Sequence, residues 1–226
     1  MLADDAYILA AAERLRIAGH WDSALQVLGD RDTAAAVRIR AETLTERFWW
    51  RHIGCSEAED AADALATHDE AFADFLRGQI SYTRILFDLS PRPDDPARAE
   101  HGFTGDGGWQ LFWSGVLADN VHRDQAVAAA RYAAAAEVAA EDLLRSYVVR
   151  HQAGHLLDGG DHEAAVEGFR TSLALRIGVG AAPQVAGAAA TLAEVATGAE
   201  SERWRGVAVT IARDLRLDPL LASITG

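Results

Sequence analysis

The chain has 226 residues and a formal net charge of −13, and 50% of its residues are hydrophobic. This composition excludes a disordered acidic tail, and the negative charge makes the chain a poor non-specific binder of nucleic acid or of anionic membranes. No stretch of 18 or more apolar residues is present, and the first residues include Asp4, Asp5 and Glu13 instead of a basic region. We therefore expect neither a membrane span nor a signal peptide.

An all-α fold is predicted, because the chain contains 47 alanines and few β-branched residues. Helix caps and the spacing of apolar residues locate the individual helices. In the first part of the chain they span residues 5–18, 21–28, 33–53, 56–68 and 71–87. Gly19, Gly29 and Gly54 follow three of these segments, as is typical of helix ends.

The segment 90–108 interrupts this pattern with three prolines and four glycines. It is interpreted as a loop with at most one short helical turn, either a surface crossover or a lid or partner-binding loop. The domain prediction is therefore N-terminal helices over 1–89, a Pro/Gly-rich loop over 90–108 and C-terminal helices over 109–226. The two helical parts are expected to form one continuous stack.

The second helical part follows this loop. Its helices span residues 109–120, 124–140, 141–158, 162–177, 183–197 and 200–215, and a short last segment contains Leu220 and Leu221. The two leucines are expected to cover the last helix pair of their own chain, or that of a second chain in a homodimer.

Three segments of the sequence resemble one another. AGHWDSALQVL (18–28) matches GGDHEAAVEGF (159–169): each has a glycine, a polar residue, a ring at Trp21 or His162, an acid, a small residue and an alanine. HRDQAVAAARY (122–132) is a weaker copy, and the equivalent Ala126 and Ala165 lie 39 residues apart. Such a period indicates repeated helix–turn–helix units.

This pattern resembles the tetratricopeptide repeat, in particular an actinobacterial group of tetratricopeptide-like proteins that shares the stretches LFWSGVLADN and SYVVRHQAGH. The resemblance implies a right-handed α-solenoid of about ten antiparallel helices. Small residues would occupy the close contacts within helix pairs, next to large residues in the adjoining pockets. The small residues are Ala12, Ala24, Ala153 and Ala165, and the large ones are Leu15, Leu28, Leu156 and Phe169.

His151 and His155 lie four residues apart on one helix, a spacing that can hold a metal ion. Gln152 stands where a zinc protease motif has its glutamate, and His162 falls at the ring position of the repeat. The favoured interpretation is two helix-surface histidines in a groove. A metal-binding or enzymatic role, with the Gly-rich loop as a lid, is the alternative.

A partner-binding groove is predicted from the positions that face the concave side in tetratricopeptide repeats. Aromatic residues enrich binding hot spots, and an arginine can clamp a carboxylate. An aromatic role in the core and an ordinary paired arginine are the alternatives. The predicted groove residues are Trp109, Trp113, Asp119, Tyr147, Arg150, His151 and Asp158.

No catalytic or cofactor motif accompanies these residues. The glycine-rich GFTGDGG (102–108) lacks the lysine of a phosphate loop, and Cys55 has no histidine at a spacing that suggests a catalytic pair. A single cysteine forms no intrachain disulfide, which fits a reducing, cytoplasmic compartment. The acidic residues around Glu59 are explained by a helix N-terminus, whose dipole favours negative charge.

The sequence therefore predicts a non-enzymatic, cytoplasmic adaptor or regulatory protein without a cofactor. Its partner would be a peptide or protein held in the concave groove, neutral or basic because the chain itself is acidic. Arg150 would be the local exception to that charge. Binding of nucleic acid or of a membrane is not expected.

Overall fold

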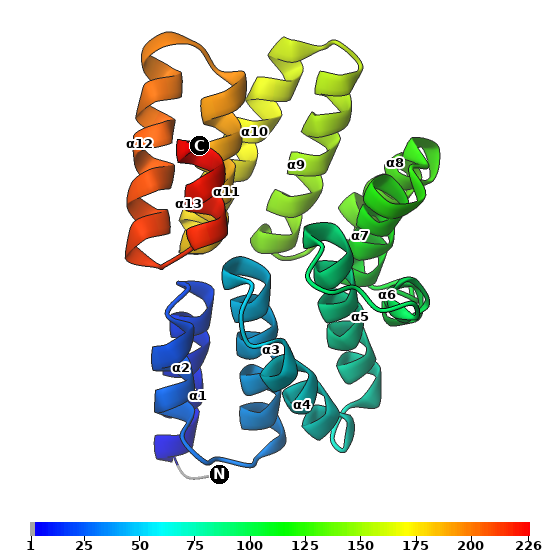
Figure 1. Ribbon diagram of the computed structural model, residues 1–226, viewed down its shortest axis with the longest axis vertical. Helices are drawn as coiled ribbons and strands as arrows, with labels where there is room; N and C mark the ends of the chain where they lie inside the picture. Colours follow the sequence, from blue (N-terminus) through cyan, green and yellow to red (C-terminus); the bar gives the residue numbers. More distant parts are fainter. Residues whose placement is uncertain (1–2) are drawn as a thin grey trace. The chain divides into compact units, whose positions relative to one another are not determined.

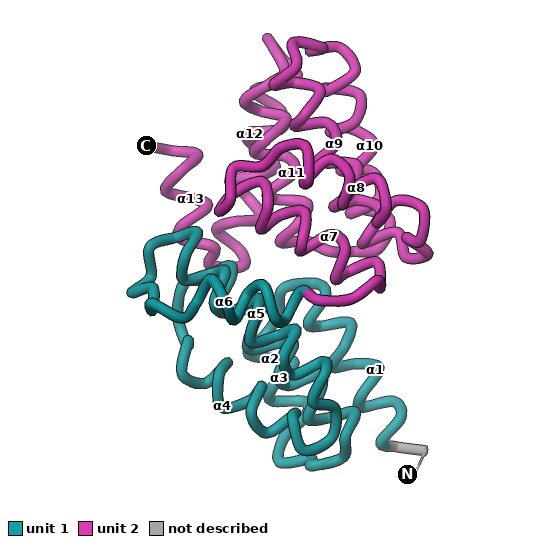
Figure 2. Tube along the Cα trace, turned by 90° about the vertical axis from the view of Figure 1, so that its right-hand side faces the viewer, with its two compact units in different colours: residues 1–103 teal, residues 104–226 magenta. Residues whose placement is uncertain are grey.

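The computed structural model describes residues 3–226, and within this range it contains thirteen α-helices, one π-helix and no strand. The predicted all-α fold is confirmed. The described chain forms two compact units, which meet in sequence between Phe103 and Thr104 (Figure 2). Among the described residues, no helix combines the length and the apolar character that crossing a membrane requires.

Unit 1 consists of helices that pack mainly on their neighbours in sequence (Figure 1). Side-chain caps explain where two of them begin: the hydroxyl of Thr33 accepts a hydrogen bond from the N–H of Ala36, and Asp69 accepts one from Phe72. The helices are α1 (Ala3–Ile17), α2 (Trp21–Leu28), α3 (Ala34–Arg51), α4 (Cys55–Ala66), α5 (Glu70–Phe87) and α6 (Asp95–Gly102).

Unit 2 repeats this arrangement, and Asp124 and Asp161 cap two of its helices in the same way. Its elements are α7 (Gly108–Leu117), the π-helix η1 (Ala118–His122), α8 (Gln125–Val138), α9 (Asp142–Asp158), α10 (His162–Gly178), α11 (Ala182–Val195), α12 (Gly198–Asp214) and α13 (Asp218–Thr225). The predicted helices agree with these bounds to within about four residues at each end.

Helix α6 differs from the prediction, which had a loop over residues 90–108. Asp95 is fully buried at the start of α6, and Pro96 occupies an early helical position that needs no N–H donor. At the other end, a Cβ on Gly102 would come within 2.9 Å of the Gly78 Cα of α5. The prolines therefore start a short helix that packs closely on α5.

Small residues lie where helices approach closely, as the repeat pattern predicted. Ala12, Ala24, Ala153 and Ala165 are all at most 1% exposed. Between α9 and α10, a Cβ added to Gly168 would lie 2.7 Å from the Ala153 Cβ, so only glycine fits at this distance.

The prediction that Leu156 fills a pocket next to the small residues is wrong. Leu156 is 41% exposed, whereas Leu157 packs against the cluster that contains Ala153 and Phe169. A helix brings positions four apart onto one face, so Leu157 lies over Ala153 while Leu156 turns outwards.

The last helix, α13, covers α11 and α12 of its own chain. Leu220 and Ile224 pack against a buried cluster of Ala189, Ala190 and Ala208. The first of the two predicted roles of this segment, covering its own helix pair, is therefore observed.

Candidate functional site

Most of the predicted groove residues gather around the buried ring of Phe112 in unit 2. The centroid of that ring lies 6.1 Å from Trp109, 5.6 Å from Trp113, 5.4 Å from Tyr147 and 5.2 Å from His151. Trp113 is only 8% exposed, which favours its interpretation as a core residue. Trp109 and Tyr147 are half-buried and stack edge to face, with 5.6 Å between their centroids.

Polar atoms beside Phe112 form a connected cluster from η1, α8 and α9. The hydroxyl of Tyr132 lies 3.2 Å from Asp119 Oδ2 and 3.1 Å from His151 Nδ1. The same Asp119 oxygen lies 3.0 Å from His155 Nε2. Tyr132 was not predicted as a site residue, although its hydroxyl joins the two halves of this cluster.

The hydrogen bonding of this cluster follows from what each group can offer. An ionised Asp119 only accepts, so His155 donates its Nε2 proton and Tyr132 donates its hydroxyl proton to the carboxylate. His151 then donates its Nδ1 proton to the Tyr132 oxygen. In this arrangement the Asp119 carboxylate fixes the tautomer of His155 directly. It fixes the tautomer of His151 indirectly, through the hydroxyl of Tyr132.

The π-helix η1 positions Asp119 for these contacts. Its wider turn follows α7 directly and ends at Arg123, which has a left-handed φ of 58°. π-helical turns are rare, and they are frequently found at functional sites. The sequence predicted a regular helix to residue 120, because apolar spacing does not reveal a π-turn.

His151 is held in its neutral form. Its burial lowers its pKa well below the usual value, and the nearby positive charges of Arg150 and Arg176 lower that pKa further. Arg150 and Arg176 thus bring positive charge next to His151 in a chain that is acidic overall.

Arg176 of α10 is the functional candidate that the sequence reasoning missed. It is 3% exposed, and its guanidinium lies over the Tyr147 ring with Cζ 4.8 Å from the centroid. It donates from Nη1 to the backbone carbonyl of Gln184 at 2.9 Å and from Nε to Ser146 Oγ at 3.3 Å. Nη2 is buried and makes no hydrogen bond.

The remaining predicted residues lie around this cluster. Arg150 is half-buried on α9, one turn from Tyr147, whereas Asp158 is exposed at the last position of α9. In the part of the chain that the structure describes, no group of three or more His, Cys, Asp or Glu side chains is placed to hold a metal ion. The nitrogens His151 Nδ1 and His155 Nε2 are already engaged by Tyr132 and Asp119.

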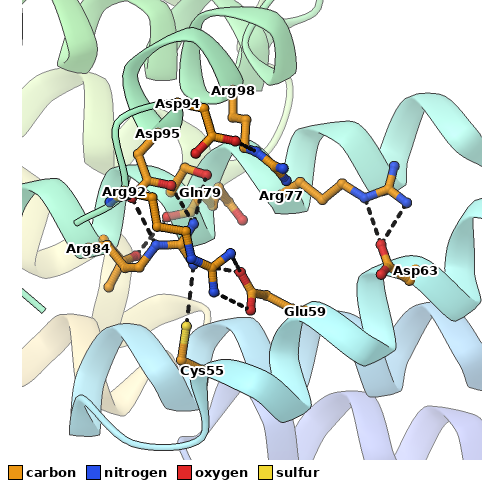
Figure 3. A network of polar contacts seen from close by, with 12 residues as sticks. Cys55, Glu59, Asp63, Arg77, Gln79, Arg84, Arg92, Asp94, Asp95 and Arg98 are labelled. Carbon is orange, nitrogen blue, oxygen red and sulfur yellow. Dashed lines mark hydrogen bonds and ion pairs between the residues drawn. The ribbon is translucent and has the colours of Figure 1, made fainter. Parts of the chain in front are cut away.

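Unit 1 contains a separate network of charges between α4, α5 and α6 (Figure 3). Arg84 is 2% exposed and pairs through two nitrogens with Asp95, and its Nη1 donates to Glu59 at 2.7 Å and to the Cys55 sulfur at 3.4 Å. Arg92 clamps the same Glu59 through both of its terminal nitrogens, at 2.7 and 2.9 Å.

The charges of this network satisfy one another. Burial alone would raise the pKa of Asp95, but hydrogen bonds from Arg84 and from the N–H of Arg92 outweigh it and hold that pKa below its usual value. Of the acidic residues at the start of α4, Glu59 is thus the partner of Arg84 in α5 and of Arg92 in the segment before α6. We assign this network a structural role, because it fastens α6 to α4 and α5.

A shallow depression of about 500 Å³ lies beside this network, and its charged groups are also paired. Arg77 bonds Asp63, Glu70 and Asp74 at 2.8–3.0 Å. The lining residues are Asp63, Asp74, Arg77, Asp94, Ala97, Arg98 and His101.

Comparison with protein-family models, with curated proteins and with solved structures finds no match for this chain. The function therefore has to be argued from the geometry of unit 2.

Proposed function

We propose that the chain is a non-enzymatic adaptor or regulatory protein of the tetratricopeptide type, and that the α9 face of unit 2 binds a peptide or protein partner. In this proposal the helical hairpins of each unit stack in the right-handed manner of such repeats, and the protein acts in the cytoplasm. The two units together would supply more helices than the ten that the repeat pattern predicted.

One observation carries the proposal: on a helical scaffold, the half-buried rings of Trp109 and Tyr147 stack edge to face, and the guanidinium of Arg176 lies over the Tyr147 ring. Aromatic and arginine side chains contribute most of the binding energy in protein interfaces, and they do so where each is partly desolvated. Rigid helices hold them, so little conformational entropy is lost on binding.

The charge distribution supports a particular kind of partner. The chain carries −13 overall, which favours a partner that is neutral or basic as a whole. Arg150 and Arg176 add local positive charge next to His151. A partner that is basic overall with one acidic group at this point fits both features.

The test is quantitative binding to an identified partner. The partner is first isolated by affinity capture on the full chain and identified, and its dissociation constant is then measured by calorimetry for variants of α9. Tyr147→Ala and Arg150→Ala should each weaken binding at least about tenfold. Arg145→Ala, at an exposed position of the same helix, serves as the matched control and should change it less than about twofold.

Unchanged affinity in both Tyr147→Ala and Arg150→Ala would rule out the α9 face as the binding surface. Circular dichroism of each variant distinguishes a lost contact from a lost fold. Light scattering on the purified chain tests a homodimer, the self-association that the sequence leaves open.

A helical enzyme or metal-binding protein is the second candidate, favoured by the contact between His155 of α9 and Asp119 of the π-helix η1. A metal at this position would have to displace the contacts of Tyr132 and Asp119. Metal analysis of the purified chain decides: one equivalent of zinc or iron that is lost in His151→Ala or His155→Ala would replace the adaptor proposal.

A further inference from the structure

Two arginines lie in the core of the described residues, and they differ in one respect. Arg84 is 2% exposed and pairs with the carboxylates of Asp95 and Glu59. Arg176 is 3% exposed and has no carboxylate partner, although the chain contains 34 acidic residues. A buried charge without a counter-charge is unfavourable, so its presence calls for an explanation.

The surroundings of Arg176 do not remove its charge. Burial, with the repulsion of Arg150, lowers its pKa to about 10, so the guanidinium stays protonated at neutral pH. Its other contacts are a serine hydroxyl, a backbone carbonyl and the Tyr147 ring, all uncharged. Among the residues that the structure describes, no carboxylate pairs with this positive charge.

The unused hydrogen-bonding capacity is local. Nη2 of Arg176 is buried without an acceptor, and Oε1 of Gln184 is buried without a donor. The backbone carbonyl of Gln184 already accepts from Arg176 Nη1, so this side chain starts beside the guanidinium. Both atoms are buried, so a ligand that reaches Nη2 would require a side chain beside it to move, and the Gln184 oxygen is one that no hydrogen bond holds in place.

We infer that the Nη2 edge of Arg176 is a binding point for a carboxylate group of the partner. A carboxylate supplies one negative charge and accepts from Nη2, the nitrogen of the guanidinium that lacks an acceptor. The Tyr147 ring lies against the Arg176 guanidinium and, together with Trp109 packed on it, offers apolar surface to the group that carries the carboxylate. A phosphate fits less well, because only one nitrogen of this guanidinium lacks an acceptor.

This inference deepens the proposed function, since it names the group that the partner would bring to α9. Its test uses small probes and no partner, so the two can fail separately. If the chain binds the probe, but its affinity for the partner is unchanged in Tyr147→Ala and Arg150→Ala, only the proposed adaptor surface is overturned.

The experiment is a calorimetric titration of the full chain with sodium benzoate at constant ionic strength. Benzoate carries a carboxylate on a flat ring, and benzamide is the neutral control of the same shape. We expect saturable binding with a dissociation constant on the order of 1 mM, as suits so small a ligand. Benzamide and inorganic phosphate should bind at least about tenfold more weakly than benzoate.

Two variants locate the site. Arg176→Met keeps an unbranched apolar chain and should weaken benzoate at least about tenfold, whereas Arg145→Met on the exposed side of α9 should change it less than about twofold. Gln184→Glu places a carboxylate next to Arg176 and should abolish benzoate binding while raising the melting temperature. This second variant decides the question if Arg176→Met does not fold.

Three results would overturn the inference. The first is wild-type protein that shows no saturable benzoate binding. The second is unchanged benzoate affinity in Arg176→Met, or in Gln184→Glu where Arg176→Met is unfolded. The third is phosphate that binds more tightly than benzoate, which would assign the site to a phosphorylated group instead.

Discussion

Arg176 lies with its guanidinium over the ring of Tyr147, 4.8 Å from the centroid, and thereby links the buried polar end of α10 to the aromatic face of α9. The ring offsets only part of the cost of burying this charge. A cation–π contact contributes about 0.5–2 kcal/mol, whereas removing an ion from water costs several kcal/mol. Tyr147 is half-buried, so the same pair connects the interior of unit 2 with its surface.

The close contact between α9 and α10 makes a first prediction about stability. Gly168→Ala should destabilise the protein by about 1–3 kcal/mol, because its Cβ would lie 2.7 Å from that of Ala153. Gly154→Ala is the matched control within α9, where a Cβ meets nothing within 4 Å. It should be neutral or stabilise by up to about 1 kcal/mol, since alanine favours the helix. Urea unfolding measures both, and equal effects would contradict the packing described.

His151 predicts a pH dependence of stability. Its pKa is lowered in the folded protein, so below its ordinary value of 6.5 the unfolded chain binds a proton that the folded chain does not. Stability should therefore fall as the pH is lowered from 6.5, by up to about 1.4 kcal/mol per pH unit. His151→Gln should remove this slope, whereas exposed His162→Gln should leave it intact. The measurement is urea unfolding between pH 5 and 7.5, and an unchanged slope in His151→Gln would refute the assignment.

Glu42 in unit 1 predicts the opposite dependence. Burial raises its pKa to about 7, only partly offset by the charge of Arg16, and neighbouring Glu13 adds repulsion. Protonation of Glu42 thus contributes stability below its ordinary pKa of 4.5, and this contribution is lost as the pH rises through 7. Glu42→Gln should be more stable than wild type at pH 8, by roughly 1–3 kcal/mol, and nearly equal at pH 5. Exposed Glu163→Gln is the control, and thermal unfolding at both pH values checks the difference.

The sequence predicted the helices well because their determinants are local. Asp124 and Asp161 cap α8 and α10 through their own first turns, and buried alanines mark the faces that pack. Helix α6 was missed because its determinants are not local. Three prolines in and just before it indicate a loop, while the contacts that stabilise it come from Arg84 and Gly78 on another helix.

The candidate site was predicted in part for the same reason. Aromatic and histidine residues on α7 and α9 stand out in the sequence, and the structure gathers them around Phe112. Tyr132 and Arg176 did not stand out. A single tyrosine in the alanine-rich helix α8 and an arginine near the end of α10 are both ordinary in helical sequences. Only tertiary packing reveals that one lies at the centre of a polar cluster and that the other lacks a counter-charge.

In the charge network of unit 1, removal of the central arginine, Arg84, should greatly lower the stability of the protein. Arg84→Met leaves the fully buried carboxylate of Asp95 without its partner and should cost about 3 kcal/mol or more. Arg92→Met removes a 47% exposed arginine from the same network and should cost less than about 1 kcal/mol. Urea unfolding compares the two, and an Arg84→Met variant as stable as wild type would contradict the structural role of this network.

The most direct test of the central claim compares Arg176→Met with Arg84→Met by urea unfolding. If Arg176 is an uncompensated cation kept for a partner, its replacement by methionine removes an unfavourable buried charge. The variant should then be as stable as wild type or up to about 2 kcal/mol more stable, in contrast to Arg84→Met. A loss of about 3 kcal/mol or more in Arg176→Met would show that Arg176 is a structural residue and would contradict the account.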